Sequence, residues 1–145
     1  MTKIVKFALL TVLALAIGCA SARGPKKTVP TFEIAKTCTA INNGYFQDAK
    51  TSFSSDRDKR VYAFARILYV REPHKVVFRW FGPNGLYHES PPVMLIEKSE
   101  YHHYVSIYQM LDISEFSKLG LQGQWRVEIQ LDGESAGVLP FTIGS

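Results

Sequence analysis

The segment QWRVEIQL (residues 124–131) is the feature that most constrains the fold of this chain. Its apolar residues, Trp125, Val127, Ile129 and Leu131, alternate with polar residues without a break. Successive side chains of a β-strand point to opposite faces of a sheet, so this alternation separates an apolar face from a polar one. On a helix the same four residues would be scattered around the axis. The segment therefore predicts a β-strand with one buried and one exposed face.

Two further segments also have strand character. FEIAKTC (residues 32–38) alternates apolar and polar residues, with Phe32, Ile34 and Cys38 expected on one face. RVYAFARILYV (residues 60–70) is apolar on both sides, which predicts a central strand that is covered on both faces. Its alanines and leucine also tolerate a helix. Because β-branched and aromatic residues predominate and a proline follows closely, we favour a strand.

A hairpin is expected next along the chain. KVVFRWF (residues 75–81) places its apolar side chains, including Trp80, on one face. It runs into the turn sequence GPNG (residues 82–85), so LYHE (residues 86–89) is expected to return beside it. Further strands are predicted at VMLIEK, YHHYVSIYQML and VLPFTI (residues 93–98, 101–111 and 138–143), and one helical turn at ISEFSKLG (residues 113–120), with Ser114 as its cap and Gly120 as its end.

Seven or eight short strands with almost no helix predict an all-β fold, an antiparallel β-sandwich. The segments VYAF, FRW, GQWRVEIQLDG and FTI (residues 61–64, 78–80, 123–133 and 141–143) resemble those of small immunoglobulin-like domains of unknown function in bacterial envelope proteins. The resemblance covers the chain after about residue 31 and implies an immunoglobulin-like sandwich, with Trp80 in the place of the core tryptophan of the third strand. The sequence lacks the inter-sheet disulfide of antibody domains, which excludes the antibody branch of immunoglobulin-like folds but not the sandwich itself.

The N-terminus has the features of an export signal. Lysines precede the apolar run FALLTVLALAI (residues 7–17), which is shorter than the roughly 20 apolar residues that span a bilayer. The following AIGC (residues 16–19) resembles the lipobox of bacterial lipoproteins, although the commonest lipobox has Leu in place of Ala16. The resemblance implies cleavage before Cys19 and attachment of lipid to its sulfur. In a Gram-negative host, Ala20 after the cysteine implies an outer-membrane lipoprotein that faces the periplasm.

Ordinary cleavage after Ala16 or after Ala22 is the alternative to lipidation. If Cys19 carries lipid, Cys38 has no partner in the chain, and we expect it to occupy a buried position as a small hydrophobe. Only cleavage after Ala16 would leave two cysteines able to form a disulfide. The expected organisation is a signal peptide (residues 1–18), a flexible tether (residues 19–30) and the immunoglobulin-like sandwich (residues 31–145).

The charge of the mature chain gives no support for nucleic-acid binding. The sequence has 17 Lys and Arg against 13 Asp and Glu, and the signal removes two of the lysines, which leaves 15 against 13 and a net charge of +2. These charges are interspersed and form no basic stripe. We therefore expect no nucleic-acid partner.

The stretch Gly133-Glu134-Ser135-Ala136-Gly137 fits the G-x-S-x-G pattern of serine esterases. That nucleophile turn needs a strand before it and a helix after it, and its family places an acid and a histidine later in the chain. Here a predicted strand follows Ser135, and the ten residues after it contain no Asp, Glu or His. The stretch therefore predicts a hairpin loop between the last two strands, and we expect no catalytic residue.

The histidines give no recognised metal-binding pattern. His102 and His103 are adjacent, so on a strand they would point to opposite faces and would not share one ion. No HExxH or CxxC motif occurs, and we expect neither a metal nor another cofactor. The alternative is a small envelope hydrolase or metal-binding protein that uses His88, His102 or His103.

The tyrosines suggest a recognition surface. We select Tyr87, His88, Tyr101, His103, Tyr104 and Tyr108 as candidate binding residues, because tyrosine combines a large apolar ring with a polar tip. Packing between neighbouring strands is the alternative role for each tyrosine. Together these features predict a lipid-anchored binding or scaffolding module without catalytic activity, which meets the membrane through Cys19 and an envelope protein or glycan through its sheet surface. A structural subunit of an envelope complex is the second hypothesis.

Overall fold

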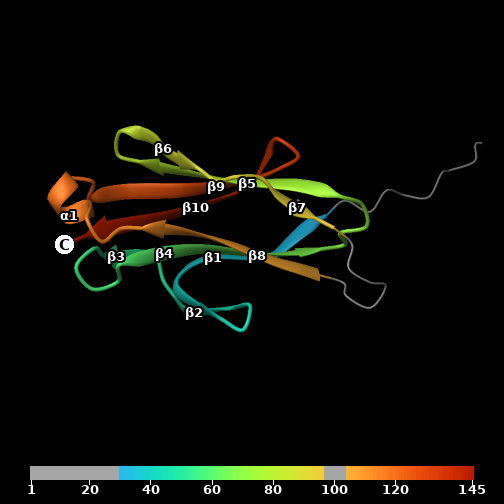
Figure 1. Ribbon diagram of the computed structural model, residues 1–145, viewed down its shortest axis with the longest axis horizontal. Helices are drawn as coiled ribbons and strands as arrows, with labels where there is room; N and C mark the ends of the chain where they lie inside the picture. The colour runs from blue at the N-terminus through green and yellow to red at the C-terminus, as the bar shows by residue number, and fades with distance from the viewer. Residues whose placement is uncertain (1–29, 97–103) are drawn as a thin grey trace, which may run out of the picture.

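The computed structural model describes residues 30–96 and 104–145, which form a sandwich of two β-sheets (Figure 1). The elements are β1 (Thr31–Asn42), β2 (Tyr45–Ala49), β3 (Ser52–Ser54), β4 (Arg60–Leu68), β5 (His74–Gly82), β6 (Gly85–Glu89), β7 (Val93–Leu95), β8 (Tyr104–Asp112), α1 (Phe116–Leu119), β9 (Gly123–Leu131) and β10 (Glu134–Gly144). One sheet has the strand order β2-β1-β4-β8 and the other β3-β10-β9-β5-β6, with β7 also paired to β5. The predicted all-β sandwich is confirmed, although the described residues form ten strands rather than seven or eight.

The core lies between the two sheets and follows the predicted alternation. The inward residues of the central strands are Val61, Ala63, Ala65 and Ile67 on β4, Val76, Phe78 and Trp80 on β5, and Trp125, Val127 and Ile129 on β9. All of them are at most 3% exposed. Full burial of a large apolar side chain contributes about 1.5–3 kcal/mol, so these three strands supply much of the driving force for folding.

Strand β1 departs from the predicted alternation because it contains a β-bulge. Its register against β4 shifts between Phe32 and Ile34. Phe32 and Ala35 therefore both pack against the core, whereas Cys38 lies opposite Tyr62 of β4 and outside the core cluster. The prediction that Phe32, Ile34 and Cys38 share one face was wrong, since the extra residue of a bulge reverses the alternation beyond it.

The β1–β2 hairpin, which sequence analysis missed, folds back over the outer side of the four-stranded sheet. Asn43 and Gly44 at its turn have positive φ angles of 50° and 75°, the conformation for which Asn-Gly is favoured in two-residue turns. Figure 1 shows β2 below the layer of β1, β4 and β8. The ring of Phe46 on β2 lies 5.3 Å from that of Phe64 on β4, and Phe64 is fully buried although it is outside the main core.

Cys38 is fully buried on this outer side, as predicted for a small hydrophobe. It pairs with Ala49 of β2 and Tyr62 of β4. Burial raises the pKa of the Cys38 thiol, so the uncharged form is favoured. Among the described residues Cys38 has no disulfide partner. Cys19, the predicted signal peptide and nearly all of the predicted tether lie outside the described residues.

Strand β3, the second strand that was missed, adds one parallel pair to an otherwise antiparallel arrangement. Its three residues pair with Thr142, Ile143 and Gly144 of β10. Phe53 in the middle of β3 enters the core and meets Phe141 edge to face, with 5.8 Å between ring centroids. The short strand therefore closes one edge of the six-stranded sheet with an aromatic contact.

The predicted helical turn is present as the four-residue helix α1, but its start differs from the expectation. Ser114 does not cap it, because Glu115 occupies the N-cap position without a side-chain capping bond. The Ser114 hydroxyl and backbone N–H instead both donate to Asp112 Oδ1. Gly120 ends the helix in the left-handed conformation, as predicted. In the described part of the chain, no helix is long and apolar enough to cross a membrane.

Asp132 connects the β9–β10 hairpin to the start of β5. Its Oδ2 lies 2.7 Å from His74 Nδ1, and its Oδ1 accepts a 2.8 Å hydrogen bond from the Lys75 backbone N–H. The backbone N–H of Asp132 donates in return to the Lys75 carbonyl at 2.8 Å. The contact with His74 and the Lys75 N–H lower the pKa of Asp132, which keeps its carboxylate ionised.

Candidate functional site

The outer side of the four-stranded sheet carries a cluster of exposed aromatic and apolar side chains. We call the surface formed by Tyr45, Arg66, Tyr104, Tyr108 and Met110 the tyrosine face. Its three tyrosines and its methionine each keep 40–48% of their surface exposed. Large apolar side chains grouped on one face of a sheet are characteristic of recognition surfaces in soluble proteins.

The pairing of β8 with β4 determines which β8 side chains belong to the tyrosine face. The two strands pair without interruption from Arg60 opposite Asp112 to Leu68 opposite Tyr104. Tyr104, Tyr108 and Met110 are separated by even numbers of residues, so all three point to the same side of β8. The alternate residues Ile107 and Leu111 are buried in the core, which fixes the tyrosines on the outside.

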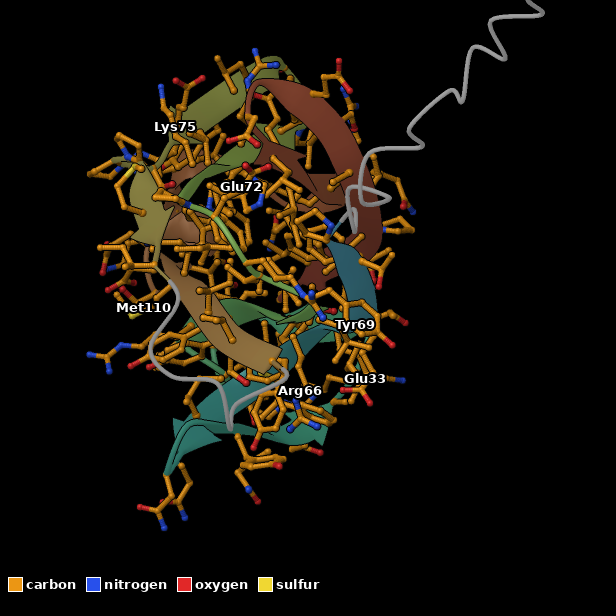
Figure 2. All side chains as sticks on the ribbon, turned by 90° about the vertical axis from the view of Figure 1, so that its right-hand side faces the viewer. Glu33, Arg66, Tyr69, Glu72, Lys75 and Met110 are labelled. Carbon is orange, nitrogen blue, oxygen red and sulfur yellow. The ribbon has the colours of Figure 1, made fainter. Side chains whose placement is uncertain are left out.

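Arg66 is the polar centre of the tyrosine face. Its guanidinium carbon lies 4.7 Å from the ring centroid of Tyr45 and 4.6 Å from that of Tyr104. Arg66 Nη1 donates to Glu33 Oε2 at 3.4 Å (Figure 2). Two cation–π contacts and one ion pair thus bring together β1, β2, β4 and β8 around a single side chain.

The electrostatic state of Arg66 is set by opposing effects. Burial acts against the charge, since only 11% of the side chain is exposed, but nearby Tyr45 and Glu33 more than offset burial and raise the pKa of Arg66. Its Nε and Nη2 are buried and have no hydrogen-bond acceptor among the described residues. Besides its ion pair with Glu33, the guanidinium is thus contacted by the rings of Tyr45 and Tyr104.

The remainder of the tyrosine face rests on packed rings. Tyr108 meets Tyr62 of β4 edge to face, with 6.3 Å between ring centroids. Phe46 and Phe64 fill the space beneath the hairpin that carries Tyr45. Tyr108 is thus held by the half-buried ring of Tyr62, and the β1–β2 hairpin by the buried ring of Phe64, which reduces the conformational entropy that a bound partner would have to overcome.

The structure does not bring the predicted binding residues onto one surface. Tyr104 and Tyr108 belong to the tyrosine face, but Tyr87 and His88 lie on β6 of the other sheet. The ring of Tyr87 packs against Trp125 and Phe116, with centroid distances of 5.2 and 5.4 Å. Tyr101, His102 and His103 lie outside the described residues. The described members are therefore divided between the two sheets, and a binding role for each of them stays a prediction.

Sequence reasoning missed Tyr45, Arg66 and Met110. Met110 could have been predicted from the sequence, because it continues the spacing of Tyr104 and Tyr108 along a predicted strand. The Asn43-Gly44 turn signal was also available, and it would have predicted the hairpin that carries Tyr45. Arg66 gave no signal of its own, since it is one charged residue in an apolar central strand.

The predicted hairpin at the G-x-S-x-G stretch is confirmed. Asp132 and Gly133 form the turn with positive φ angles of 52° and 88°, and Ser135 lies on β10 opposite Gln130 of β9. Ser135 is exposed and is followed by strand rather than helix. Within residues 30–96 and 104–145, no three His, Cys, Asp or Glu side chains converge as they would to hold a metal ion.

A hollow of about 440 Å³ lies at the end of the sandwich where β3 pairs with β10, and two of the charged residues that line it form an ion pair. Lys50 Nζ lies 2.8 Å from Asp58 Oδ1, and Asp58 Oδ2 also accepts the Ser54 backbone N–H at 2.7 Å. The Ser54 hydroxyl has no partner among the described residues. The lysine and the carboxylate therefore neutralise each other, and Arg57 also lines the hollow.

Comparison with known proteins gives the fold and no family. No protein-family model and no curated protein sequence matches the chain. An alkylpurine DNA glycosylase of Pseudomonas fluorescens, bound to DNA containing an abasic site analogue, superposes with a TM-score of 0.53 at 10% identity over 80% of this chain. The present chain spans 30% of the length of that glycosylase.

Two smaller proteins match over nearly their whole lengths. An immunoglobulin-like protein of Pseudomonas aeruginosa has a TM-score of 0.47 at 8% identity and covers 82% of this chain and 99% of its own. A CARDB domain of Pyrococcus furiosus, in complex with di-metal ions, has a TM-score of 0.38 at 12% identity, with coverages of 83% and 97%. The described part of the chain is a sandwich of two β-sheets, and the match to the glycosylase bears on this fold alone.

Proposed function

We propose that this chain is a non-catalytic binding module of the bacterial cell envelope, which docks a protein partner on its tyrosine face. The observation that carries the proposal is the arrangement of Arg66 between exposed tyrosines on one side of the sandwich. Tyrosine, arginine and methionine are enriched in protein interfaces, and tyrosine and arginine are the residues that most often dominate binding energy. The chain would act by presenting this preformed surface.

The geometry favours a protein over a glycan. A sugar ring stacks on the open, flat face of an aromatic side chain. Here the guanidinium of Arg66 lies over the rings of Tyr45 and Tyr104. One face of each of these rings is therefore covered by the cation, which leaves less open ring for a flat sugar and suits the side chains of a folded partner better.

The proposal is tested by site-specific photocrosslinking in cells. We expect a photoreactive phenylalanine analogue at Tyr45 or Tyr104 to crosslink to the same protein. Leu86 and Val138 on the other sheet are 52% and 49% exposed and serve as matched control positions. Once the crosslinked partner is identified and purified, Tyr45→Ala should weaken its binding by more than about 1 kcal/mol, roughly fivefold in affinity, as for an interface hot spot. Equal crosslinking from both sheets, or retention by envelope polysaccharide alone, would contradict a protein-binding tyrosine face.

We also propose that lipid on Cys19 holds the module at the membrane, in the outer membrane facing the periplasm if the host is Gram-negative. The lipobox-like AIGC supports this proposal, and the Pro- and Lys-containing segment up to residue 30 would serve as the tether. We expect Cys19→Ser to move the protein from the membrane fraction to the soluble fraction of envelope extracts. Cys38→Ser is the matched control and should leave the fractionation unchanged, whereas retention of Cys19→Ser at the membrane would exclude a lipid anchor.

A further inference from the structure

Strand β8 is a long and regular edge of the four-stranded sheet. Among the described residues it pairs only with β4, over nine consecutive residues and without a bulge. Its sequence, YVSIYQMLD, has no Lys, Arg or Pro, and its only charge is Asp112 at the end. Soluble proteins commonly protect such edges with charges, prolines, bulges or short strands. None of these devices interrupts β8.

The other edges of the sandwich differ from β8. On the far side of the same sheet, β2 has five residues and carries Asp48. The edges of the second sheet are β3, with three residues, β6, with five residues including Glu89, and β7, with three residues. Strand β8 is thus the described edge best suited to receive another strand.

The sequence of β8 is complementary to itself. When two copies run antiparallel with Tyr108 at the centre, the outer face places Tyr108 opposite Tyr108, Ser106 opposite Met110 and Tyr104 opposite Asp112. On the inner face Ile107 lies opposite Gln109, and Val105 opposite Leu111. No like charges meet in this register, and an aromatic pair occupies its centre, which stabilises cross-strand pairing.

We propose that two copies of this chain associate along β8 about a two-fold axis that passes beside Tyr108, joining their four-stranded sheets into one eight-stranded sheet. Identical edges that meet around a two-fold axis form a closed dimer and leave no further β8 edge free. Asp112, the only charge of the strand, is held ionised by hydrogen bonds from Ser114 and by nearby Arg60, which lower its pKa. Its charge therefore has partners within its own chain and does not oppose the approach of the second copy.

The dimer goes beyond the proposed binding function, because it would join the tyrosine faces of two copies. The tyrosine faces of the two copies would lie on the same side of the joined sheet, since antiparallel pairing about an axis normal to the sheet keeps outer faces together. Tyr104, Tyr108 and Met110 border the joined edge in each copy. The two faces would then form one continuous surface with two sets of the same recognition residues, which increases the avidity for a repeated partner.

A charge exchange at Tyr108 tests the proposal. Two differently tagged full-length chains are produced together in cells, solubilised in mild detergent and isolated through one tag, and the second tag is quantified. We expect wild-type chains to co-purify. Tyr108→Lys in both chains, and Tyr108→Glu in both chains, should each reduce co-purification by about tenfold, because like charges then face each other across the axis. Tyr108→Lys in one chain with Tyr108→Glu in the other should restore it.

The mixed pair separates an interface effect from a folding defect, since neither variant could recover by mixing if it were unfolded. Val138→Lys, similarly exposed but on β10 of the other sheet, is the control and should co-purify like the wild type. Failure of the wild-type chains to co-purify, unchanged recovery of the Lys–Lys pair, or no recovery of the Lys–Glu pair would each overturn the β8 dimer. The crosslinks expected at Tyr45 do not depend on these results.

Discussion

Replacing Trp80 with alanine is expected to lower the free energy of unfolding by about 3–5 kcal/mol, as for other buried aromatic residues cut back to alanine. Trp80 is fully buried on β5, between strands β9 and β6. Its ring meets Phe141 edge to face, with 6.1 Å between centroids. Both flanking strands are hydrogen-bonded to β5, so they would close the cavity only in part. Chemical denaturation followed by far-ultraviolet circular dichroism measures the effect.

The matched control is Trp80→Phe, for which we expect less than half of that loss. Trp80 Nε1 is buried and has no acceptor among the described residues. An unsatisfied buried N–H destabilises a protein by about 1–3 kcal/mol, and phenylalanine removes that group together with part of the ring. In Trp80→Phe the removal of the unsatisfied N–H therefore stabilises the protein, while the loss of ring volume destabilises it. Equal losses for Trp80→Ala and Trp80→Phe would show that ring volume at this position does not stabilise the core.

The fold could be predicted from sequence where alternation is uninterrupted. Trp125, Val127 and Ile129 gave the strongest pattern, and all three are buried as expected. The pattern failed on β1, where the bulge between Phe32 and Ile34 exchanges the two faces. A bulge depends on how two strands pair, and no periodicity within one strand reveals it.

The candidate site was harder to predict from the sequence than the fold, and the reason was not a bulge. Sequence analysis finds which residues share a face of one strand, but not which strands share a sheet. Tyr87 and Tyr104 looked equivalent in sequence, yet they lie on opposite sheets. Tyr45 reaches Arg66 only because the β1–β2 hairpin folds back over the sheet. We expect this arrangement of the hairpin to depend on Phe64, which is buried and packs against Phe46 of β2.

We therefore expect Phe64→Ala to affect stability and binding together. The free energy of unfolding should fall by about 3 kcal/mol, the lower end of the range for a buried phenylalanine, because the hairpin can settle partly into the space. Phe64 is fully buried beneath Phe46, with 5.3 Å between ring centroids. Loss of this contact should loosen β2 and move Tyr45 away from Arg66, so crosslinking from position 45 should also decline.

The measurement that distinguishes this role from ordinary core packing is amide hydrogen exchange. In Phe64→Ala the amides of β2 (Tyr45–Ala49) should lose protection before those of β9, because Phe46 of the hairpin packs on Phe64. Phe64→Leu keeps most of the volume, so its loss should stay below about 1.5 kcal/mol with β2 still protected. If β2 and β9 lose protection together in Phe64→Ala, the hairpin is not a separate cover held by Phe64. The placement of Tyr45 would then require another cause, and the Arg66 contacts with Tyr45 and Tyr104 on either side of it would be the first to test.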